Sequence, residues 1–532
     1  MILERVQPTA SASLPANEAE VGPSGGAAFS PWRRSARLGL LLVVLYAVVR
    51  SLLDAMSRPF WYDELCTVVV ARQPGVSAIW RAIEHAADGQ PPAFYIMERV
   101  VSGEFTRELV GFRLLSIVAL CVTLACVFMF VERRGGSVLG LLCACTLFLT
   151  ALLHPYSVEA RPYALLVACI AFACVCYQRA PAFRWMVLMA VALALAQAVH
   201  YYAILAIVLF GMAELVYLGQ KRQFRRNAWL ACAFGAIPLV IYWPLLKRFR
   251  DVYGSHFWSH PRLAVALASY GSFLNISFLA GLLVAAIAIV GLGWPDEPQT
   301  QLPTDAPTSS TPSHERALIA GLLLLPLIMM LAAKLAHGGF TDRYALPVVL
   351  AFPLTAGCIL PRLGRRFIAV VALFIGVAVV RQETGFWTSE RKQSGTWQSP
   401  AGPAESLLAL AGNDTLPVAV SNVQDYFQLA YYSSADSKRR FVYLADTAAS
   451  VKFLGSDSGD RQMLVLRSYY PLQVRDFRAF SSRHMSFLLY SGNKSRLDWW
   501  PDRLVHDGDL LQLLASRGKS RLYLVTIGAS VQ

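Results

Sequence analysis

Long apolar stretches dominate this sequence and restrict the folds open to it. Between residues 38 and 381, about eleven stretches approach the roughly 20 residues that a helix needs to cross a bilayer. The chain is 56% hydrophobic and only 15% charged, unlike a soluble globular protein. The sequence therefore predicts a polytopic α-helical membrane protein, with spans at 38–54, 112–131, 137–153, 162–178, 184–199, 202–218, 228–246, 269–293, 317–336, 344–360 and 366–381.

Basic residues indicate the orientation of these spans. Arginines precede the first span, and the positive-inside tendency keeps them, and the N-terminus, in the cytoplasm. Later basic clusters at 133–134, 221–226 and 362–366 also fall on cytoplasmic joints, so the net charge of +14 indicates topology rather than nucleic-acid binding. Lys247, Arg248 and Arg250 fall on an outer joint. They are either a local exception or a site for an anionic lipid headgroup or a phosphate.

Composition separates three other segments from the predicted membrane domain at 36–381. Residues 1–35 are rich in Ala, Ser, Pro and Gly, which predicts a disordered cytoplasmic tail, and the proline-rich residues 294–316 predict a flexible cytoplasmic linker. Because an odd number of spans precedes residues 382–532, that part is expected outside the cytoplasm. It alternates predicted strands (417–421, 441–444, 485–490 and 522–527) with helices (423–432 and 509–515), which favours a soluble α/β domain. The ten cysteines show neither a disulfide framework nor a Cys-His metal spacing.

An acidic pair, Asp63-Glu64, lies in the aromatic first outer loop, residues 55–111. Adjacent carboxylates at a lipid–water boundary are costly unless they have a task, although a solvated acidic loop is the simpler alternative. Later in the same loop, Pro91-Pro92 predicts an extended approach followed by the start of a helix. The predicted spans themselves are almost free of charge, which favours chemistry at the outer surface over ion-coupled transport.

The other informative polar residues also fall on outer joints. Glu159 and Arg161 stand two residues apart where one helix ends and the next begins, as either an interfacial ion pair or a phosphate site. Arg343 heads a later span, where it can snorkel or hold an anionic phosphate. The histidines and tyrosines of these joints are either interfacial anchors or substrate contacts: His154, Tyr163, His200, Tyr201, His256, His260 and Tyr344.

The order of these motifs resembles the GT-C superfamily, most closely its bacterial branch related to protein O-mannosyltransferases and lipid A aminoarabinose transferases. The resemblance is carried by Asp63-Glu64, Gln90-Pro91-Pro92, the Glu159 to Tyr163 stretch and Arg343-Tyr344, and covers residues 36–381. It implies a bacterial inner-membrane enzyme that moves a sugar from a polyprenyl phosphate to an acceptor hydroxyl outside the cytoplasm, usually with inversion. The acceptor is a glycan, a lipid or a protein.

The resemblance also implies roles for individual residues. Asp63 is expected to be the general base, and Glu64 to orient the acceptor or to bind a divalent metal such as Mg²⁺, Mn²⁺ or Ca²⁺, which not all members need. Arg58, Arg161 and Arg343 are expected to bind the donor phosphate. The substrate-binding candidates are Glu159, Tyr163, His154, His200, Tyr201, His256, His260 and Tyr344. Two alternatives remain: a flippase for lipid-linked sugars, and a scaffold whose C-terminal domain binds a partner.

Overall fold

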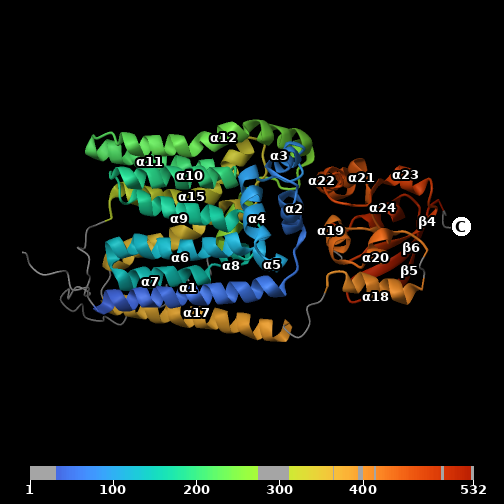
Figure 1. Cartoon of the computed structure of the whole chain (residues 1–532), viewed down its shortest axis with the longest axis horizontal. Coiled ribbons are helices and arrows are strands. Elements are labelled where there is room, and N and C mark those ends of the chain that lie inside the picture. The colour runs from blue at the N-terminus through green and yellow to red at the C-terminus, as the bar shows by residue number, and fades with distance from the viewer. Residues whose placement is uncertain are drawn as a thin grey trace, which may run out of the picture.

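A bundle of roughly parallel helices carries an α/β domain at one end (Figure 1). The computed structural model describes residues 31–273, 311–362, 365–393, 399–412, 415–492 and 496–528. The predicted span at 269–293 and the predicted linker at 294–316 lie largely outside the described residues, as does the predicted tail up to residue 30.

Six helical stretches among the described residues are long and apolar enough to cross a membrane. Four shorter apolar helical stretches pack among them, so the predicted polytopic helical architecture is confirmed. The bundle comprises α1 (Pro31–Ser57), α6 (Leu114–Gly135), α7 (Ser137–Cys145), α9 (Tyr163–Tyr177), α10 (Phe183–Val199), α11 (Ala203–Lys221), α12 (Arg226–Tyr253), α13 (Leu263–Phe273), α15 (Ser313–Leu335), α16 (Ala351–Ile359) and α17 (Arg365–Gln393), with 3-10 turns η1 (Thr146–Leu149), η3 (Asp342–Leu350) and η4 (Leu360–Arg362).

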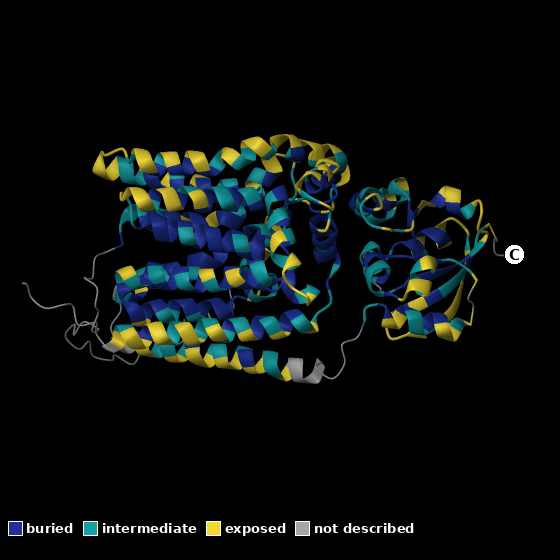
Figure 2. Cartoon of the chain, viewed as in Figure 1, coloured by how far each residue is buried: buried dark blue, intermediate teal, exposed yellow. Residues whose placement is uncertain are grey.

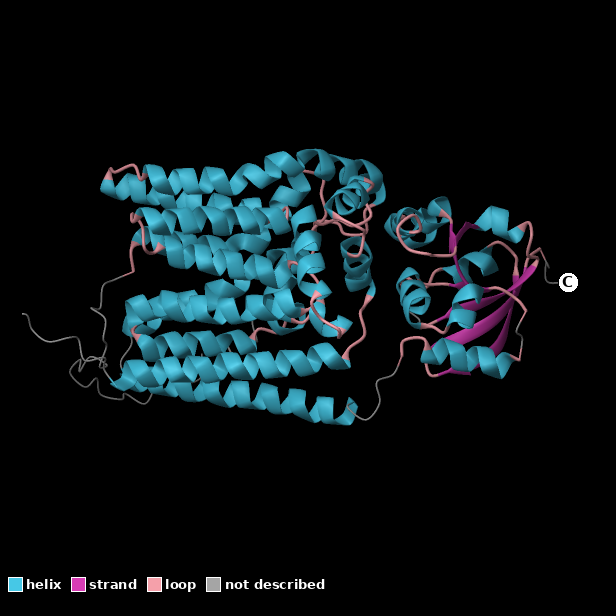
Figure 3. Ribbon diagram, viewed as in Figure 1, coloured by secondary structure: helices cyan, strands magenta, loops and turns pink. Residues whose placement is uncertain are grey.

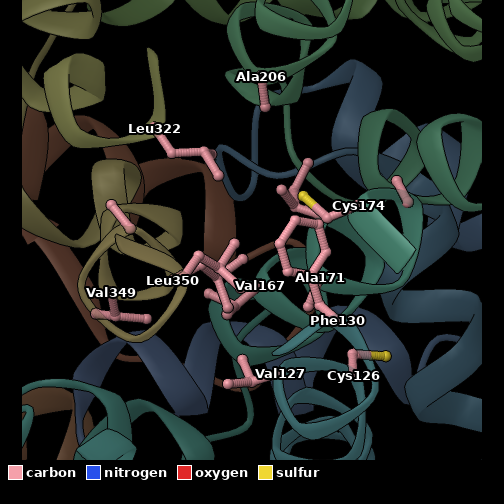
Figure 4. Packing of buried hydrophobic residues seen from close by; sticks show 14 of the residues in the cluster. Cys126, Val127, Phe130, Val167, Ala171, Cys174, Ala206, Leu322, Val349 and Leu350 are labelled. Atoms are coloured by element: carbon pink, nitrogen blue, oxygen red, sulfur yellow. The ribbon is translucent and has the colours of Figure 1, made fainter. Parts of the chain in front are cut away.

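Helix α9 lies at the centre of the bundle. Almost all of its residues are buried, whereas α12 and α17 expose many apolar side chains on the outside (Figure 2). Val167 and Cys174 of α9 pack near Val127 and Phe130 of α6 and Leu350 of η3 (Figure 4). Because α9 is held on all sides, its first residue, Tyr163, has a fixed position at the end of the bundle that faces the α/β domain.

Three predicted boundaries in the membrane domain differ from the structure. Helix α1 begins at Pro31, inside the predicted tail. The predicted span at 344–360 is divided into η3 and α16, and the prolines Pro347 and Pro353, which lack an N–H, interrupt regular helical hydrogen bonding there. Helix α17 continues to Gln393, twelve residues past the predicted end at 381, although its last turns are polar.

One charged pair lies where α1 meets α17, and its acidic partner, Glu383, falls beyond the predicted span at 366–381. Arg50 of α1 forms a buried ion pair with Glu383 of α17, with 2.6 Å between Nε and Oε2. Tyr46 Oη donates to the same Oε2 across 2.6 Å. A paired charge is far less costly in a bilayer than a single one, so these polar residues lie between two helices that both have apolar outer faces.

The first outer loop folds into four short helices: α2 (Tyr62–Ala71), α3 (Val76–Glu84), α4 (Pro92–Gly103) and α5 (Glu108–Gly111). Helix α4 begins at Pro92 after Pro91 in extended conformation, as the proline pair predicts. A further short helix, α8 (Leu153–Ser157), leads into the stretch before α9. Together they cover the end of the bundle next to the α/β domain (Figure 1).

The C-terminal domain is a six-stranded mixed sheet in the order β3-β2-β1-β4-β6-β5, with helices around it (Figure 3). Strands β3, β2, β1 and β4 are parallel, and β6 and β5 follow as an antiparallel pair. The predicted α/β domain is confirmed. The strands are β1 (Val418–Val420), β2 (Phe441–Ala445), β3 (Val474–Asp476), β4 (Ser486–Ser491), β5 (Leu510–Arg517) and β6 (Ser520–Thr526), and the helices are α18 (Gly402–Ala411), α19 (Val423–Tyr432), α20 (Ala435–Arg440), α21 (Thr447–Leu454), α22 (Ser458–Leu466), α23 (Phe477–Ser481) and α24 (Trp500–His506).

Two predictions in this domain need correction. The segment predicted as a helix at 509–515 is strand β5, because it forms a hairpin with β6 through a turn in which Gly518 has a φ of +60°. Its short apolar run fits either period, and the cross-strand hydrogen bonds decide between them. The three-residue strand β3 was not predicted. Helix α19, in contrast, spans the residues predicted for it.

Candidate functional site

Predicted site residues from four distant parts of the chain meet at the end of the bundle next to the C-terminal domain. They come from the start of α2, the stretch between α8 and α9, the joint between α10 and α11, and the start of η3. These residues form three groups: a buried salt bridge between Glu64 and Arg113, an ion pair between Asp63 and Arg343, and a cluster of aromatic rings around them.

Glu64 and Arg113 form the buried salt bridge. Arg113 Nε lies 2.7 Å from Glu64 Oε1, Arg113 Nη2 lies 2.7 Å from Oε2, and both side chains are only 1% exposed. The backbone N–H groups of Trp61 and Ala160 also donate to Glu64, across 3.2 and 2.9 Å. Glu64 thus ties the start of α2 to the start of α6 and to the stretch before α9.

Asp63, the neighbour of Glu64, faces a different partner. Its Oδ2 lies 2.7 Å from Arg343 Nη1, and the two side chains are 16% and 14% exposed. The Arg343 guanidinium carbon lies 5.5 to 5.8 Å from the ring centres of Trp61, Tyr163 and Trp258. An arginine enclosed by aromatic faces stays charged and oriented, and the nearby Tyr163 and Asp63 raise the pKa of Arg343 despite its burial.

Gly339 allows the loop that carries Arg343 to approach the segment that carries Trp258. A Cβ at Gly339 would clash with the Phe257 ring and lie 3.3 Å from Ser259 O, so a larger residue would force at least this ring to move. Ser259 Oγ donates to Phe340 O across this contact, and Tyr202 Oη, at the start of α11, donates to Gly339 O of the same loop. Because glycine lacks a Cβ, Gly339 permits this close approach of the two segments.

Arg161 is buried beneath Asp63. Its Nη1 donates to Asp88 Oδ2 across 2.6 Å, to Thr67 Oγ1 across 3.1 Å and to the backbone oxygen of Asp63 across 3.2 Å. The Asp88 charge raises the pKa of Arg161 well above its usual value although burial opposes this. Arg161 therefore holds the first turns of α2 against the segment before α4.

Glu159 brings a third carboxyl group to the site. Burial, reinforced by the negative charges of Glu64 and Asp63, raises the pKa of Glu159 to about 8. Its Oε2 is buried and has no hydrogen-bond partner among the residues that the structure describes. Near neutral pH, Glu159 is therefore mostly a neutral carboxylic acid that can donate a hydrogen bond.

His200 and Tyr344 complete a cluster of rings around Tyr163. The His200 ring lies 5.7 Å from Tyr163 and 5.4 Å from Tyr344, and Tyr344 stacks on Tyr202 at 5.2 Å. Burial, with the charges of Arg161 and Arg343, lowers the pKa of His200 to about 3, so its imidazole is neutral at physiological pH. Tyr201 is nearby in sequence, and Gln197 Nε2 donates to its backbone oxygen across 3.2 Å.

Four other predicted site residues lie further out. His154 Nε2 lies 3.1 Å from Asp54 Oδ2, and Arg58 Nε lies 2.8 Å from Asp54 Oδ1, so Asp54 joins these two predicted residues. The positive charge of Arg58 nevertheless reaches Glu159, whose pKa it lowers. His256 and His260 are exposed on the segment that follows α12.

Several buried polar atoms of the candidate site have no hydrogen-bond partner within the described parts of the chain. They are Trp61 Nε1, Arg58 Nη2 and Arg343 Nε, which are donors, and Glu159 Oε2. Buried donors without partners are rare in folded proteins unless a ligand or water binds them. Three such donors, two of them on arginines, are suited to an anionic group.

The residues present do not fit the predicted metal role of Glu64. All the hydrogen bonds described for its two oxygens come from Arg113, Trp61 and Ala160. Across the described ranges, no group of three or more His, Cys, Asp and Glu side chains is arranged to hold a metal ion.

Three functional residues were not predicted from the sequence: Arg113, Trp258 and Asp54. Arg113 had one usable signal, because it is a single charge directly before the long apolar helix α6. Trp258 lies in an aromatic run that predicts either an interfacial anchor or a surface for stacking on a sugar, and its position over Arg343 depends on a contact between distant segments. Asp54 ends a predicted span and gave no separate signal.

Comparison with solved structures identifies the fold. No protein-family model and no curated protein matches the chain. The crystal structure of ArnT from Cupriavidus metallidurans bound to undecaprenyl phosphate superposes with a TM-score of 0.54 at 13% identity, over 94% of this chain and 99% of that one. The chain has the fold of ArnT. The apo structure of ArnT gives a TM-score of 0.57 at 13% identity, over 92% and 98% of the two chains. The predicted fold, a polytopic helical membrane domain with a C-terminal α/β domain, is thus confirmed, and the match extends into the C-terminal domain.

Proposed function

We propose that the chain is a membrane glycosyltransferase that uses a sugar linked to a polyprenyl phosphate. The fold supports this proposal, because one ArnT structure of this fold is bound to undecaprenyl phosphate. Apolar helices provide a surface for a long isoprenoid tail, and the candidate site lies where the phosphate of such a lipid would leave the hydrocarbon region. The acceptor is a glycan, lipid or protein hydroxyl, and the structure favours none of these.

The ion pair between Asp63 and Arg343 carries the proposal. In the transfer, the acceptor oxygen attacks the anomeric carbon of the sugar, and the bond from that carbon to the phosphate oxygen breaks. Arg343, with Arg58 and the Trp61 indole N–H, stabilises the charge that grows on the departing phosphate. Asp63 takes the proton from the acceptor hydroxyl. A phosphate that binds Arg343 would compete with Asp63 for the guanidinium and so free the carboxylate to act as a base.

Glu159 and Arg161 have supporting roles in this mechanism. Glu159, protonated near neutral pH, donates a hydrogen bond to the donor sugar or its phosphate, because its neutral form adds no negative charge to the phosphate site. Arg161 acts indirectly. It donates hydrogen bonds to the Asp63 backbone and to Asp88, and so fixes the position of α2 relative to the segment before α4. Tyr163, His200 and Tyr344 form the wall behind Arg343.

The distribution of charge supports one orientation of the chain in a bacterial inner membrane. Arg33 and Arg37 of α1 pair with Glu132 of α6 at the end of the bundle remote from the site. Basic residues favour the cytoplasmic side, so we place the N-terminus in the cytoplasm and the site and the C-terminal domain outside it.

Transfer by the Asp63→Asn protein tests the proposal. Full-length protein in lipid nanodiscs is supplied with a radiolabelled polyprenyl-phosphate sugar and a panel of acceptors, and both released polyprenyl phosphate and glycosylated product are measured. The wild type is expected to yield both in equal amounts. Asp63→Asn is expected to bind the donor lipid but to lose at least about 100-fold in rate, a typical loss for a general base.

The exposed Asp251, near the end of α12, provides the matched control, and Asp251→Asn is expected to behave as wild type. Full transfer by Asp63→Asn would refute the base assignment. Movement of intact donor lipid across the bilayer of liposomes, without any release of polyprenyl phosphate, would instead support the flippase alternative.

A further inference from the structure

The C-terminal domain contacts the chain on both sides of Asp63. Before it, both backbone polar groups of Phe60 bond to α19: the Phe60 N–H donates to Tyr432 Oη across 2.7 Å, and Gln428 Nε2 donates to Phe60 O across 3.0 Å. The Phe60 ring also meets Tyr431 edge to face, with 6.5 Å between the ring centres. The segment that leads into α2 is thus fixed by residues more than 360 positions later in the chain.

After Phe60, the C-terminal domain binds Tyr62. Tyr62 Oη donates to Gln462 Oε1 of α22 across 2.7 Å, and its ring packs against Phe427 at 5.9 Å. Gln462 Nε2 points to Cys66 Sγ at 3.3 Å and to Ala87 O at 3.4 Å. One glutamine therefore connects the first and second turns of α2 with the segment next to Asp88, the residue that holds Arg161.

Asp63 follows Phe60 and Tyr62 in the chain and precedes Cys66, so contacts with the C-terminal domain flank it, and its carboxylate points to Arg343 of the membrane domain. The first turn of α2 is therefore held from two sides. Glu64 fixes it to Arg113, and the C-terminal domain fixes Phe60 and Tyr62. A base must lie within hydrogen-bond reach of the proton it removes, and a misplacement of about 1 Å can reduce the rate by about 100-fold.

We propose that Gln462 and Tyr432 are positioning residues for Asp63, so that the C-terminal domain sets the geometry of the base. This inference rests on the proposed function. Gln462 is the more informative residue to change, because its side-chain amide bonds two segments that both lead to the site. Its effect is expected on the chemical step, since Tyr62 is the direct neighbour of the base, whereas Arg343, a proposed phosphate ligand, lies on η3, which none of these hydrogen bonds involves.

The test compares Gln462→Ala with wild type as full-length proteins in nanodiscs, by measuring kcat and the KM for the donor. We expect kcat to fall by about 10- to 100-fold with the donor KM unchanged. Tyr62→Phe removes the same hydrogen bond from the other side, so the double variant is expected to lose no more than the more damaged single variant. Gln512→Ala, on an exposed position of β5, is the matched control and is expected to retain wild-type kcat.

Two results would overturn the inference: full kcat in Gln462→Ala, or a double variant whose loss equals the product of the two single losses. The melting temperature of each variant is measured as well. If Gln462→Ala fails to fold, Tyr432→Phe provides the same kcat and KM comparison, because it removes only the hydroxyl that binds the Phe60 N–H. A wild type without any transfer activity would refute the proposed function itself, whereas an active wild type with an insensitive Gln462→Ala would refute only the positioning role.

Discussion

The Glu64–Arg113 pair predicts a large loss of stability when Arg113 is replaced by Met. Met preserves the length of the side chain but leaves the Glu64 carboxylate charged and buried, with only the N–H groups of Trp61 and Ala160 to satisfy it. Arg113 also donates to the backbone oxygens of three residues at the end of α1 and beyond it, across 2.7 to 3.2 Å: Ala55, Arg58 and Pro59. Removal of one partner from a buried pair typically costs about 3–5 kcal/mol, and the orphaned carbonyls place Arg113→Met near the top of that range.

The measurement is the loss of folded protein with temperature, or with added denaturing detergent, in solubilised samples. Arg72→Met is the matched control, because Arg72 pairs with Glu108 at 2.9 Å in the same outer loop, while the two side chains are 52% and 34% exposed. An exposed pair of this kind contributes about 0–1 kcal/mol, so its loss should be small. The double variant Glu64→Leu, Arg113→Met removes both charges and is expected to recover part of the stability.

Two outcomes would contradict a structural role for Glu64. One is an Arg113→Met protein that is no less stable than Arg72→Met. The other is a Glu64→Gln protein of wild-type stability that binds donor but does not transfer sugar, since that pattern belongs to a catalytic carboxylate. The second result would instead support the role that the family resemblance of the sequence implies for Glu64, the orientation of the acceptor.

Two further predictions concern the pKa of Glu159 and the planar guanidinium group of Arg343. Folding raises the Glu159 pKa from 4.5 to about 8, so the folded protein binds this proton more tightly than the unfolded chain. The free energy of unfolding should therefore fall as pH rises from about 4.5 to about 8. Glu159→Gln should flatten the pH profile of the melting temperature in that window. Arg343→Lys keeps the charge but loses the planar fork between the aromatic rings, so the donor KM should rise by about 10-fold in transfer assays; an unchanged KM would argue against phosphate binding by Arg343.

The fold was predictable from the sequence to the extent that single segments carry their own signal. The apolar stretches, the start of α4 at Pro92 and helix α19 each depend on local composition or periodicity. The structure has α4 and α19 where expected, and helices over most of the apolar stretches that it describes. Segments whose state depends on a distant partner were not predictable. Strand β5 requires β6, and the polar end of α17 requires Tyr46 and Arg50 of α1.

The same distinction applies to the candidate site. The sequence identifies which joints hold polar residues, and the structure brings Asp63, Glu159, Arg161 and Arg343 together from three of them. It does not identify their partners. Whether an arginine binds a carboxylate in the core or faces a ligand depends on distances between segments that are up to 280 residues apart.

The division of labour between Asp63 and Glu64 follows from the geometry of α2. Consecutive residues of a helix point about 100° apart, so two adjacent acids in a first turn cannot face the same partner. Both gain from the partial positive charge at the helix start, which favours carboxylates there whatever else they do. Glu64 points into the core and meets Arg113, while Asp63 points to the partly exposed Arg343. The buried acid fixes the turn in place, and a fixed turn is what its neighbour needs to act as a base. An acidic pair in this position therefore combines one structural and one chemical task, and exchanging the two residues should abolish both.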